Sequence, residues 1–208
     1  PKEFRLKVEG LVRQPISLSL DELRRLPEKT TTATLTCAGN RRSEYNGPEY
    51  EDVPKVGGVQ WEGGTIGNAT WAGTLLANVL KQAEVTEGAK HVWFEGLDRI
   101  PKNGQTIGFG GSIPIEKAMH DAGNGAPLLT HTMNGAALTP DHGYPLRMVV
   151  PGYIGARSVK WLGKIVVSDR PSPNHYVATA YKIVKKTTPL DWSESGPIYR
   201  FPINAAIC

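Results

Sequence analysis

Apolar and polar residues alternate in several stretches of this chain with the two-residue period of half-buried β-strands. In FRLKVEG, Phe4, Leu6 and Val8 are separated by charged residues. The β-branched stretch TTATLT, residues 31–36, leads directly into Cys37, so the cysteine is expected where a strand gives way to a loop. Four further strands are predicted in HVWFEG, PLLTHTMNG, LRMVVPG and KWLGKIVVS, which begin at His91, Pro127, Leu146 and Lys160.

Three other segments repeat apolar residues at helical spacing. In SLSLDELRRLP, Ser19 and Glu22 have the spacing of a capping box ahead of a leucine stripe, and Pro27 ends the helix. TLLANVLKQA, residues 74–83, gathers its apolar side chains on one helical face. SIPIEKAMHDAG, residues 112–123, is predicted to be a helix from its Ser and Pro at the start to its Gly at the end.

The order of these elements predicts the fold class. Strands and helices are mixed without a regular βαβ period, and no internal repeat is present, so we predict one α+β domain over residues 1–208. Residues 46–67 are rich in Gly, Pro and acidic side chains and are expected to form a long irregular loop. Such a loop in a compact domain is usually functional or mobile.

Composition and charge exclude several classes of protein. The apolar content of 39% and charged content of 21% are those of an ordinary globular protein. No apolar run approaches the roughly 20 residues that span a bilayer, so no membrane span is expected. A dispersed net charge of +4 does not indicate nucleic-acid binding but suits an anionic ligand. Cys37 and Cys208 form no disulfide framework, and the compartment stays unknown.

Cys37 precedes two arginines in CAGNRR, and this arrangement favours chemistry at the thiol. Guanidinium groups at Arg41 and Arg42 would stabilise the thiolate, which is the form that attacks electrophiles and binds soft metals. A cysteine can equally be a small buried hydrophobe, and the arginines can be solvated surface charges. The spacing alone leaves both interpretations open.

A second group of polar residues lies in DHGYPLRMVVPGYIGARSVKW, residues 141–161. Arginine forks, a lysine and the amides of glycine turns are what a phosphate or other oxyanion requires. Surface loops around a buried histidine are the structural alternative, and neither GxxxxGK[ST] nor GxGxxG after a strand is present. The candidate ligands in this group are His142, Arg147, Arg157, Ser158 and Lys160.

Asp98 and Tyr181 are isolated candidates. Asp98 in FEGLD could accept hydrogen bonds from the N–H groups of a heterocycle, and Tyr181 with Lys182 could bind an anion. Read alone, Asp98 is equally a turn residue and Tyr181 an ordinary strand aromatic. The histidines do not have the spacing of a zinc site.

Taken together, these stretches resemble the molybdenum-cofactor domain of the sulfite oxidase family. CAGNRRSE, WAG, FEGLD, MNG, DHGYPLRMVVPG, GARSVKWL and AYK occur in the family's order and near its spacings, from one end of the chain to the other. The resemblance implies the sulfite-oxidase-type fold and a cofactor of molybdenum and molybdopterin, a pterin dithiolene. It also implies that the Arg-Asn-His segment before this region and the C-terminal dimerisation domain of the family lie outside this chain.

The resemblance assigns roles to individual residues. Cys37 matches the only protein ligand to molybdenum, and a soft thiolate suits a sulfur-rich metal site. Arg42, Tyr181 and Trp61 match residues of the substrate anion pocket. The residues that match cofactor contacts are Asp98, His142, Arg147, Arg157, Ser158 and Lys160.

The implied reaction is the molybdenum-dependent oxidation of sulfite to sulfate, with electrons passed to a cytochrome or other separate acceptor. A eukaryotic-type assimilatory nitrate reductase shares the fold and the cofactor, although nitrate reductases lack the tyrosine that matches Tyr181. A catalytically silent binding module is a third possibility. The loop at residues 45–60 is longer than in animal and plant relatives, and Ala180 replaces their aspartate. These two departures favour a bacterial protein, which would then be periplasmic, although the compartment itself stays unknown. The C-terminal domain that the resemblance implies would allow a homodimer.

Overall fold

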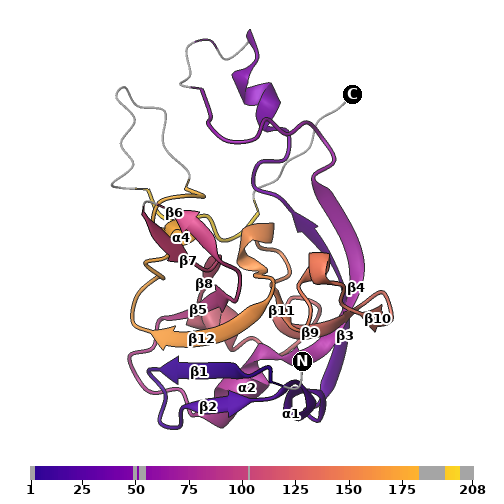
Figure 1. The fold of residues 1–208 in the computed structure, drawn as a ribbon, viewed down its shortest axis with the longest axis vertical. Helices are drawn as coiled ribbons and strands as arrows, with labels where there is room; N and C mark the ends of the chain where they lie inside the picture. The colour runs from indigo at the N-terminus through magenta and orange to yellow at the C-terminus, as the bar shows by residue number, and fades with distance from the viewer. Residues whose placement is uncertain (1–2, 49–50, 52–54, 103, 183–194, 202–208) are drawn as a thin grey trace.

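In the computed structural model, one mixed sheet and one antiparallel sheet form the body of the protein (Figure 1). The structure describes residues 3–48, 51, 55–102, 104–182 and 195–201. In the first sheet β1 pairs parallel with β12, and every other neighbouring pair is antiparallel. Its strands, in spatial order, are β2 (Ile16–Leu18), β1 (Leu6–Gly10), β12 (Leu162–Ser168), β5 (His91–Gly96) and β8 (Gly110–Pro114).

The second sheet carries the chain to Cys37. Strands β3 and β4 are paired in register along the whole of β3, from Glu28 opposite Thr74 to Thr36 opposite Ile66. They run side by side, and the described residues between them, within 38–48 and 55–65, form a projecting loop that extends beyond the body of the molecule (Figure 1). The sheet consists of β10 (Ala136–Ala137), β9 (Leu128–Met133), β4 (Ile66–Leu75) and β3 (Glu28–Thr36), with β11 (Arg147–Val149) also paired to β9. A separate hairpin pairs β6 (Ile100–Lys102) with β7 (Gln105–Ile107).

Helices are few and short. The capping box predicted at the start of α1 (Leu20–Arg24) is confirmed: Ser19 accepts a hydrogen bond from the Glu22 amide, and the Glu22 carboxylate accepts one from the Ser19 amide. No helix among the described residues is both long and apolar enough to cross a bilayer. The others are α2 (Leu76–Ala83), α3 (Ile115–Ala118) and α4 (His175–Ala178), with 3-10 turns η1 (Arg42–Asn46), η3 (Pro140–His142) and η4 (Gly155–Arg157).

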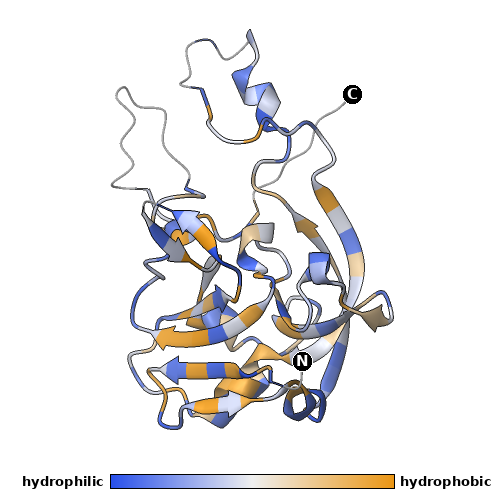
Figure 2. Ribbon diagram, viewed as in Figure 1, coloured by the Kyte–Doolittle hydropathy of each residue, from blue (hydrophilic) through white to orange (hydrophobic). Residues whose placement is uncertain are grey.

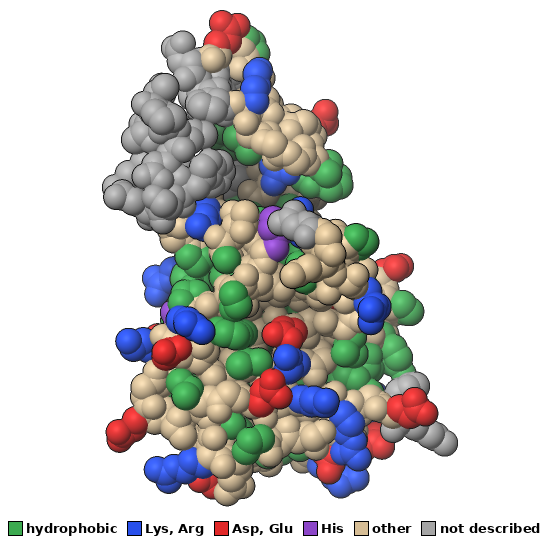
Figure 3. Space-filling model, turned by 60° about the vertical axis from the view of Figure 1, so that its left-hand side comes forward, with side chains coloured by type: hydrophobic (Ala, Val, Ile, Leu, Met, Phe, Trp, Pro, Cys, Tyr) green, Lys and Arg blue, Asp and Glu red, His purple; other side chains and the backbone are tan. Residues whose placement is uncertain are grey.

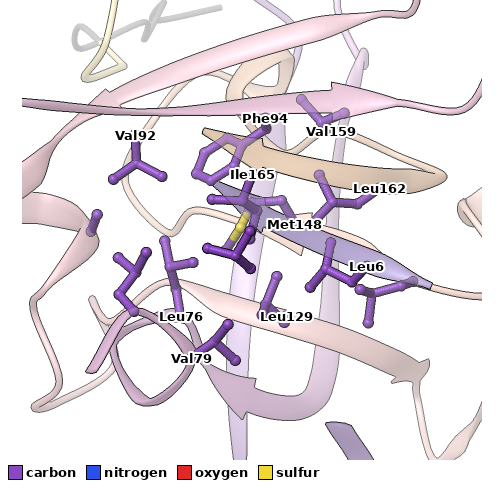
Figure 4. Close-up of a cluster of buried hydrophobic side chains, with 14 of the residues drawn as sticks. Leu6, Leu76, Val79, Val92, Phe94, Leu129, Met148, Val159, Leu162 and Ile165 are labelled. Carbon is purple, nitrogen blue, oxygen red and sulfur yellow. The ribbon is translucent and has the colours of Figure 1, made fainter. Parts of the chain in front are cut away.

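The main core lies between the first sheet, α2 and the inner strands of the second sheet. Orange apolar positions alternate with blue polar ones along β1, as a strand buried on one face requires (Figure 2). Phe94 and Ile165 from the first sheet meet Leu76 of α2 and Met148 of β11, all with no exposed surface (Figure 4). Each such side chain contributes about 1.5–3 kcal/mol by leaving water.

The α+β class and the mixed sheets with short helices are confirmed, but two local predictions are wrong. The helix expected over residues 112–123 begins as strand β8, because Ser112 and Ile113 pair with Trp93 and Val92 of β5, which leaves only one helical turn. Strand β4 was missed because its sequence is poor in large apolar residues. Its Gly73 is required by close approach to β9, since a Cβ there would lie 2.0 Å from the Leu129 oxygen.

The surface carries charges of both signs. In Figure 3, basic and acidic side chains are interspersed over the lower part of the face shown. This distribution agrees with the mild net charge of +4.

Candidate active site

Cys37 follows the last residue of β3, as the sequence predicts, and backbone contacts fix its position. Its amide donates to the Thr65 oxygen at 2.9 Å, and the Gly39 amide donates to its Sγ at 3.4 Å. Gly155 of η4 packs on the same backbone, because a Cβ there would lie 3.0 Å from the Thr36 oxygen. The thiol is free of any disulfide and half-buried, so it is held rigidly and remains accessible to a ligand.

The two arginines after Cys37 have different environments. Arg41 has a left-handed backbone and forms a 2.6 Å ion pair with Glu44. Arg42 instead donates from Nη1 to the Val59 oxygen at 2.8 Å, across the projecting loop. Its guanidinium lies against two glycines: a Cβ on Gly39 would be 2.5 Å from Nη2, and one on Gly58 would be 2.7 Å from Nη1. The position of the Arg42 guanidinium therefore depends on close contact with glycine backbone, where a larger residue would not fit.

Tyr181 shares an electrostatic neighbourhood with Cys37 and Arg42. Burial raises the pKa of Tyr181, the Cys37 charge raises it further, and the charges of Arg42 and Arg157 lower it. Its phenol therefore stays protonated at neutral pH and can donate a hydrogen bond. Tyr181 is not in a strand; it follows α4 with a φ of 55°, a left-handed conformation that is uncommon outside glycine.

A cavity of about 170 Å³ collects four of the predicted cofactor contacts. Side chains from well-separated parts of the sequence line it, on the turn after β5, on β11 and on the segment after η4. Two cations and one carboxylate among them give the cavity a positive surplus. Its lining residues are Asp98, Phe109, Arg147, Gly155, Ala156, Ser158, Val159, Lys160 and Trp161.

Arg147 is the most deeply buried cation of this cavity. It donates to the oxygens of His142 at 3.0 Å and Ser158 at 3.2 Å, and its guanidinium lies 4.8 Å from the Trp71 ring. Both acceptors are neutral carbonyls, and Nε has no hydrogen-bond partner among the described residues. Burial lowers the pKa of Arg147 to about 10. A buried cation with a donor to spare is suited to an anionic ligand.

The other polar residues of the cavity are held by the backbone. Lys160 donates to the Asp141 oxygen at 2.9 Å, and its pKa is lowered by burial and by the charge of Arg147. Asp98 accepts from the Phe109 amide at 2.9 Å. The hydroxyl of Ser158 accepts from the Val150 amide at 3.0 Å. Each side chain is thus oriented before any ligand arrives.

Besides Cys37, Arg42 and Tyr181, three predicted site residues lie outside this cavity. The His142 ring is exposed and bonds to the Thr139 hydroxyl at 2.8 Å, although its carbonyl supports Arg147. Trp61 is 44% exposed on the projecting loop. Arg157 is fully buried, and its guanidinium lies near the rings of Tyr181 and Tyr199.

Two aromatic residues that line the cavity, Trp161 and Phe109, were not among the residues predicted from the sequence. Trp161 stood inside the quoted motif GARSVKWL, and its indole N–H donates to the Pro140 oxygen at 2.8 Å. Phe109 stacks on Tyr176 with ring centroids 4.2 Å apart, and no local pattern in the sequence marks it. A larger open pocket of about 750 Å³, between α3 and the turn at Gly152, contains none of the predicted site residues.

Comparison with known proteins places this arrangement in a family. The family model described as "Oxidoreductase molybdopterin binding domain" matches residues 1–176. Mitochondrial sulfite oxidase of Rattus norvegicus is 42% identical over 213 residues, which cover 100% of this chain and 37% of the relative. A nitrate reductase [NADPH] of Emericella nidulans is 39% identical over 213 residues, covering 98% of this chain and 23% of the relative.

A solved structure has the same fold. The sulfane dehydrogenase SoxCD from Paracoccus pantotrophus superposes with a TM-score of 0.74 at 30% identity, covering 94% of this chain and 46% of the other. The chain spans less than half the length of each of these three relatives. The family model and the relatives agree along the chain, and we conclude that it belongs to the oxidoreductase molybdopterin-binding domain family.

Proposed function

We propose that this chain is the catalytic domain of a longer molybdenum-dependent oxidoreductase and binds molybdopterin in the 170 Å³ cavity. The polar side chains that line this cavity fit molybdopterin. Arg147 offers an unpartnered Nε to an anion, Lys160 adds a second cation, and Asp98 offers a carboxylate to a pterin N–H. Cys37 would be the protein ligand to molybdenum, because a half-buried, backbone-fixed thiolate suits a soft metal site.

We infer that the substrate is sulfite, which is oxidised with water to sulfate, releasing two electrons and two protons. When bound, the cofactor supplies oxygen-atom transfer and accepts the electrons. Arg42 holds the oxyanion by charge, and Tyr181 donates a hydrogen bond to it. The convergence of Cys37, Arg42 and Tyr181 in one electrostatic neighbourhood is the observation that carries this proposal.

Nitrate reduction is the second candidate, and one observation favours it. The nitrate reductase of Emericella nidulans is nearly as similar to this chain as the sulfite oxidases are, at 39% identity. A pocket of arginine and tyrosine donors would bind either oxyanion. Tyr181 supports sulfite over nitrate, since the sequence resemblance associates this tyrosine with sulfite oxidation.

The electrons would pass to a cytochrome or another acceptor in a different domain or protein. The similarity to several relatives more than twice as long supports further domains in the whole protein. The homodimerisation domain that the sequence resemblance implies would be one of them. Trp61, exposed on the projecting loop, would then contact substrate only if the loop packs inward in the loaded protein.

The test uses the full-length protein, purified from a host that makes the cofactor. Molybdenum and pterin content is measured first, and then sulfite-dependent reduction of ferricyanide and nitrate reduction with a reduced dye, on the same sample. Stoichiometric molybdenum with sulfite turnover supports the proposal. Nitrate turnover without sulfite turnover would reverse the choice of substrate, and absence of molybdenum would refute the cofactor assignment.

A further inference from the structure

Arg157 does not line the cofactor cavity, and its guanidinium lies near the rings of Tyr181 and Tyr199. Its side chain is fully buried. Nε donates to the Ile198 oxygen and Nη1 donates to the Tyr176 oxygen, both at 2.9 Å. The guanidinium lies 6.0 Å from the ring centroid of Tyr181. These contacts differ in kind from those of Arg147, which supports the cavity.

The two carbonyls that Arg157 joins belong to the segments on either side of Tyr181. Tyr176 lies in α4, which ends three residues before Tyr181. Ile198 lies on the returning segment, and its own amide donates to the Tyr181 oxygen at 2.8 Å. The Arg157 guanidinium therefore links the segment before Tyr181, through Tyr176, to the segment that pairs with Tyr181, through Ile198.

Tyr181 needs such support because of its backbone. Its φ of 55° is unfavourable for a residue with a side chain, and a strained residue persists only where the surrounding structure holds it. The Tyr176 ring lies 6.4 Å from the Tyr181 ring on one side, and Arg157 lies on another. The left-handed backbone of Tyr181 and the two hydrogen bonds of the Arg157 guanidinium together indicate that the surrounding structure holds this tyrosine in position.

We propose that Arg157 is a positioning residue for Tyr181: by bridging the Tyr176 and Ile198 carbonyls it keeps the phenol beside Arg42 and Cys37. The catalytic effect of this bridge rests on the proposed function, in which Tyr181 contacts the oxyanion. A lysine at position 157 keeps the charge but offers a single ammonium, which cannot span two carbonyls as a planar fork does. The bridge, more than the charge, is therefore the property to test.

The kinetic test is a double-mutant cycle in the full-length, cofactor-loaded protein. Arg157→Lys and Tyr181→Phe are each expected to lower kcat/KM for sulfite by about 10- to 100-fold, as loss of a transition-state contact does. The double variant should be no worse than Tyr181→Phe, because both changes remove the same interaction. Tyr199→Phe is the control: its ring also lies near Arg157, and its hydroxyl has no partner among the described residues. Two results would overturn the proposal: a loss of kcat/KM in the double variant equal to the product of the two single losses, or loss of pterin in Arg157→Lys alone. The second result would assign Arg157 to cofactor binding.

A second readout does not depend on the substrate. With 3-fluorotyrosine incorporated, the fluorine NMR signal of Tyr181 is identified as the one that Tyr181→Phe removes. Arg157→Lys should shift or broaden that signal and leave the signal of Tyr144 unchanged. If this occurs in a protein that does not oxidise sulfite, the sulfite proposal fails and the bridge stands. An unperturbed Tyr181 signal refutes the bridge whatever the substrate is.

Discussion

Arg147→Met should separate the stability of the fold from cofactor retention. Met is close to arginine in length and carries no charge, so it fills the site beside Trp71 without a cation. In the cofactor-free protein, we expect the free energy of unfolding to change by no more than about 1–2 kcal/mol. In the loaded protein, we expect cofactor affinity to fall by about 30- to 100-fold.

The magnitude follows from opposing effects at one side chain. Burial lowers the pKa of Arg147 to about 10, and at about 1.4 kcal/mol per pKa unit this costs the folded state about 3 kcal/mol. Because the folded pKa is the lower one, this cost is present at every pH below about 10. Hydrogen bonds to two carbonyls return about 1 kcal/mol or more each, and the Trp71 contact returns about 1–2 kcal/mol. The balance in the empty protein is close to zero.

The assay compares urea unfolding of the cofactor-free protein with pterin retention in the loaded protein. Arg170→Met is a matched control, because it removes one positive charge from an exposed position outside the cavity lining. It should leave both properties unchanged. If Arg147→Met destabilised the empty protein by more than about 4 kcal/mol, its role would be structural. If the variant kept its pterin as wild type does, our assignment of the cavity would be wrong.

Three further predictions address the thiol, the loop and pH. Cys37→Ser should abolish turnover while pterin content and the thermal unfolding midpoint stay near wild type; retained turnover would show that the thiol is not the metal ligand. Gly58→Ala should raise the KM for sulfite by about tenfold or more, since a Cβ would lie 2.7 Å from Arg42 Nη1. Gly64→Ala is the control: it introduces the same left-handed strain but meets nothing within 4 Å, so KM should stay unchanged. Burial lowers the pKa of His91, so the folded state resists protonation of this ring. The free energy of unfolding, measured by urea titration, should therefore decrease as pH falls below about 6.5, and it should decrease less steeply in His91→Gln.

The sequence predicted best those features that local patterns determine. Alternation along FRLKVEG located β1, and the Ser19–Glu22 spacing located the cap of α1. Strand β8 was mistaken for a helix because its pairing partner, β5, is distant in sequence and outweighs local propensity. The same limitation concealed β4, whose small residues serve a close approach between strands.

The candidate site was predictable only in part. Four of the residues that the motifs predicted as cofactor contacts, Asp98, Arg147, Ser158 and Lys160, line one cavity. Motif membership could not separate Arg157 from them, because adjacent residues in a tight turn such as η4 point in different directions. Phe109 was out of reach for a similar reason: its place at the cavity depends on stacking against a residue far along the chain.

The continuous β3–β4 ladder has a consequence for how this site can diversify. Every residue of β3 up to Thr36 lies opposite a residue of β4, so the amide hydrogens that point into this ladder should exchange slowly, and Cys37 follows directly after the last pair. Arg42 instead depends on a loop that makes irregular contacts. Insertions in that loop can therefore change the surroundings of Arg42 while the thiol stays in place, and relatives with different substrates need differ little in the sheet.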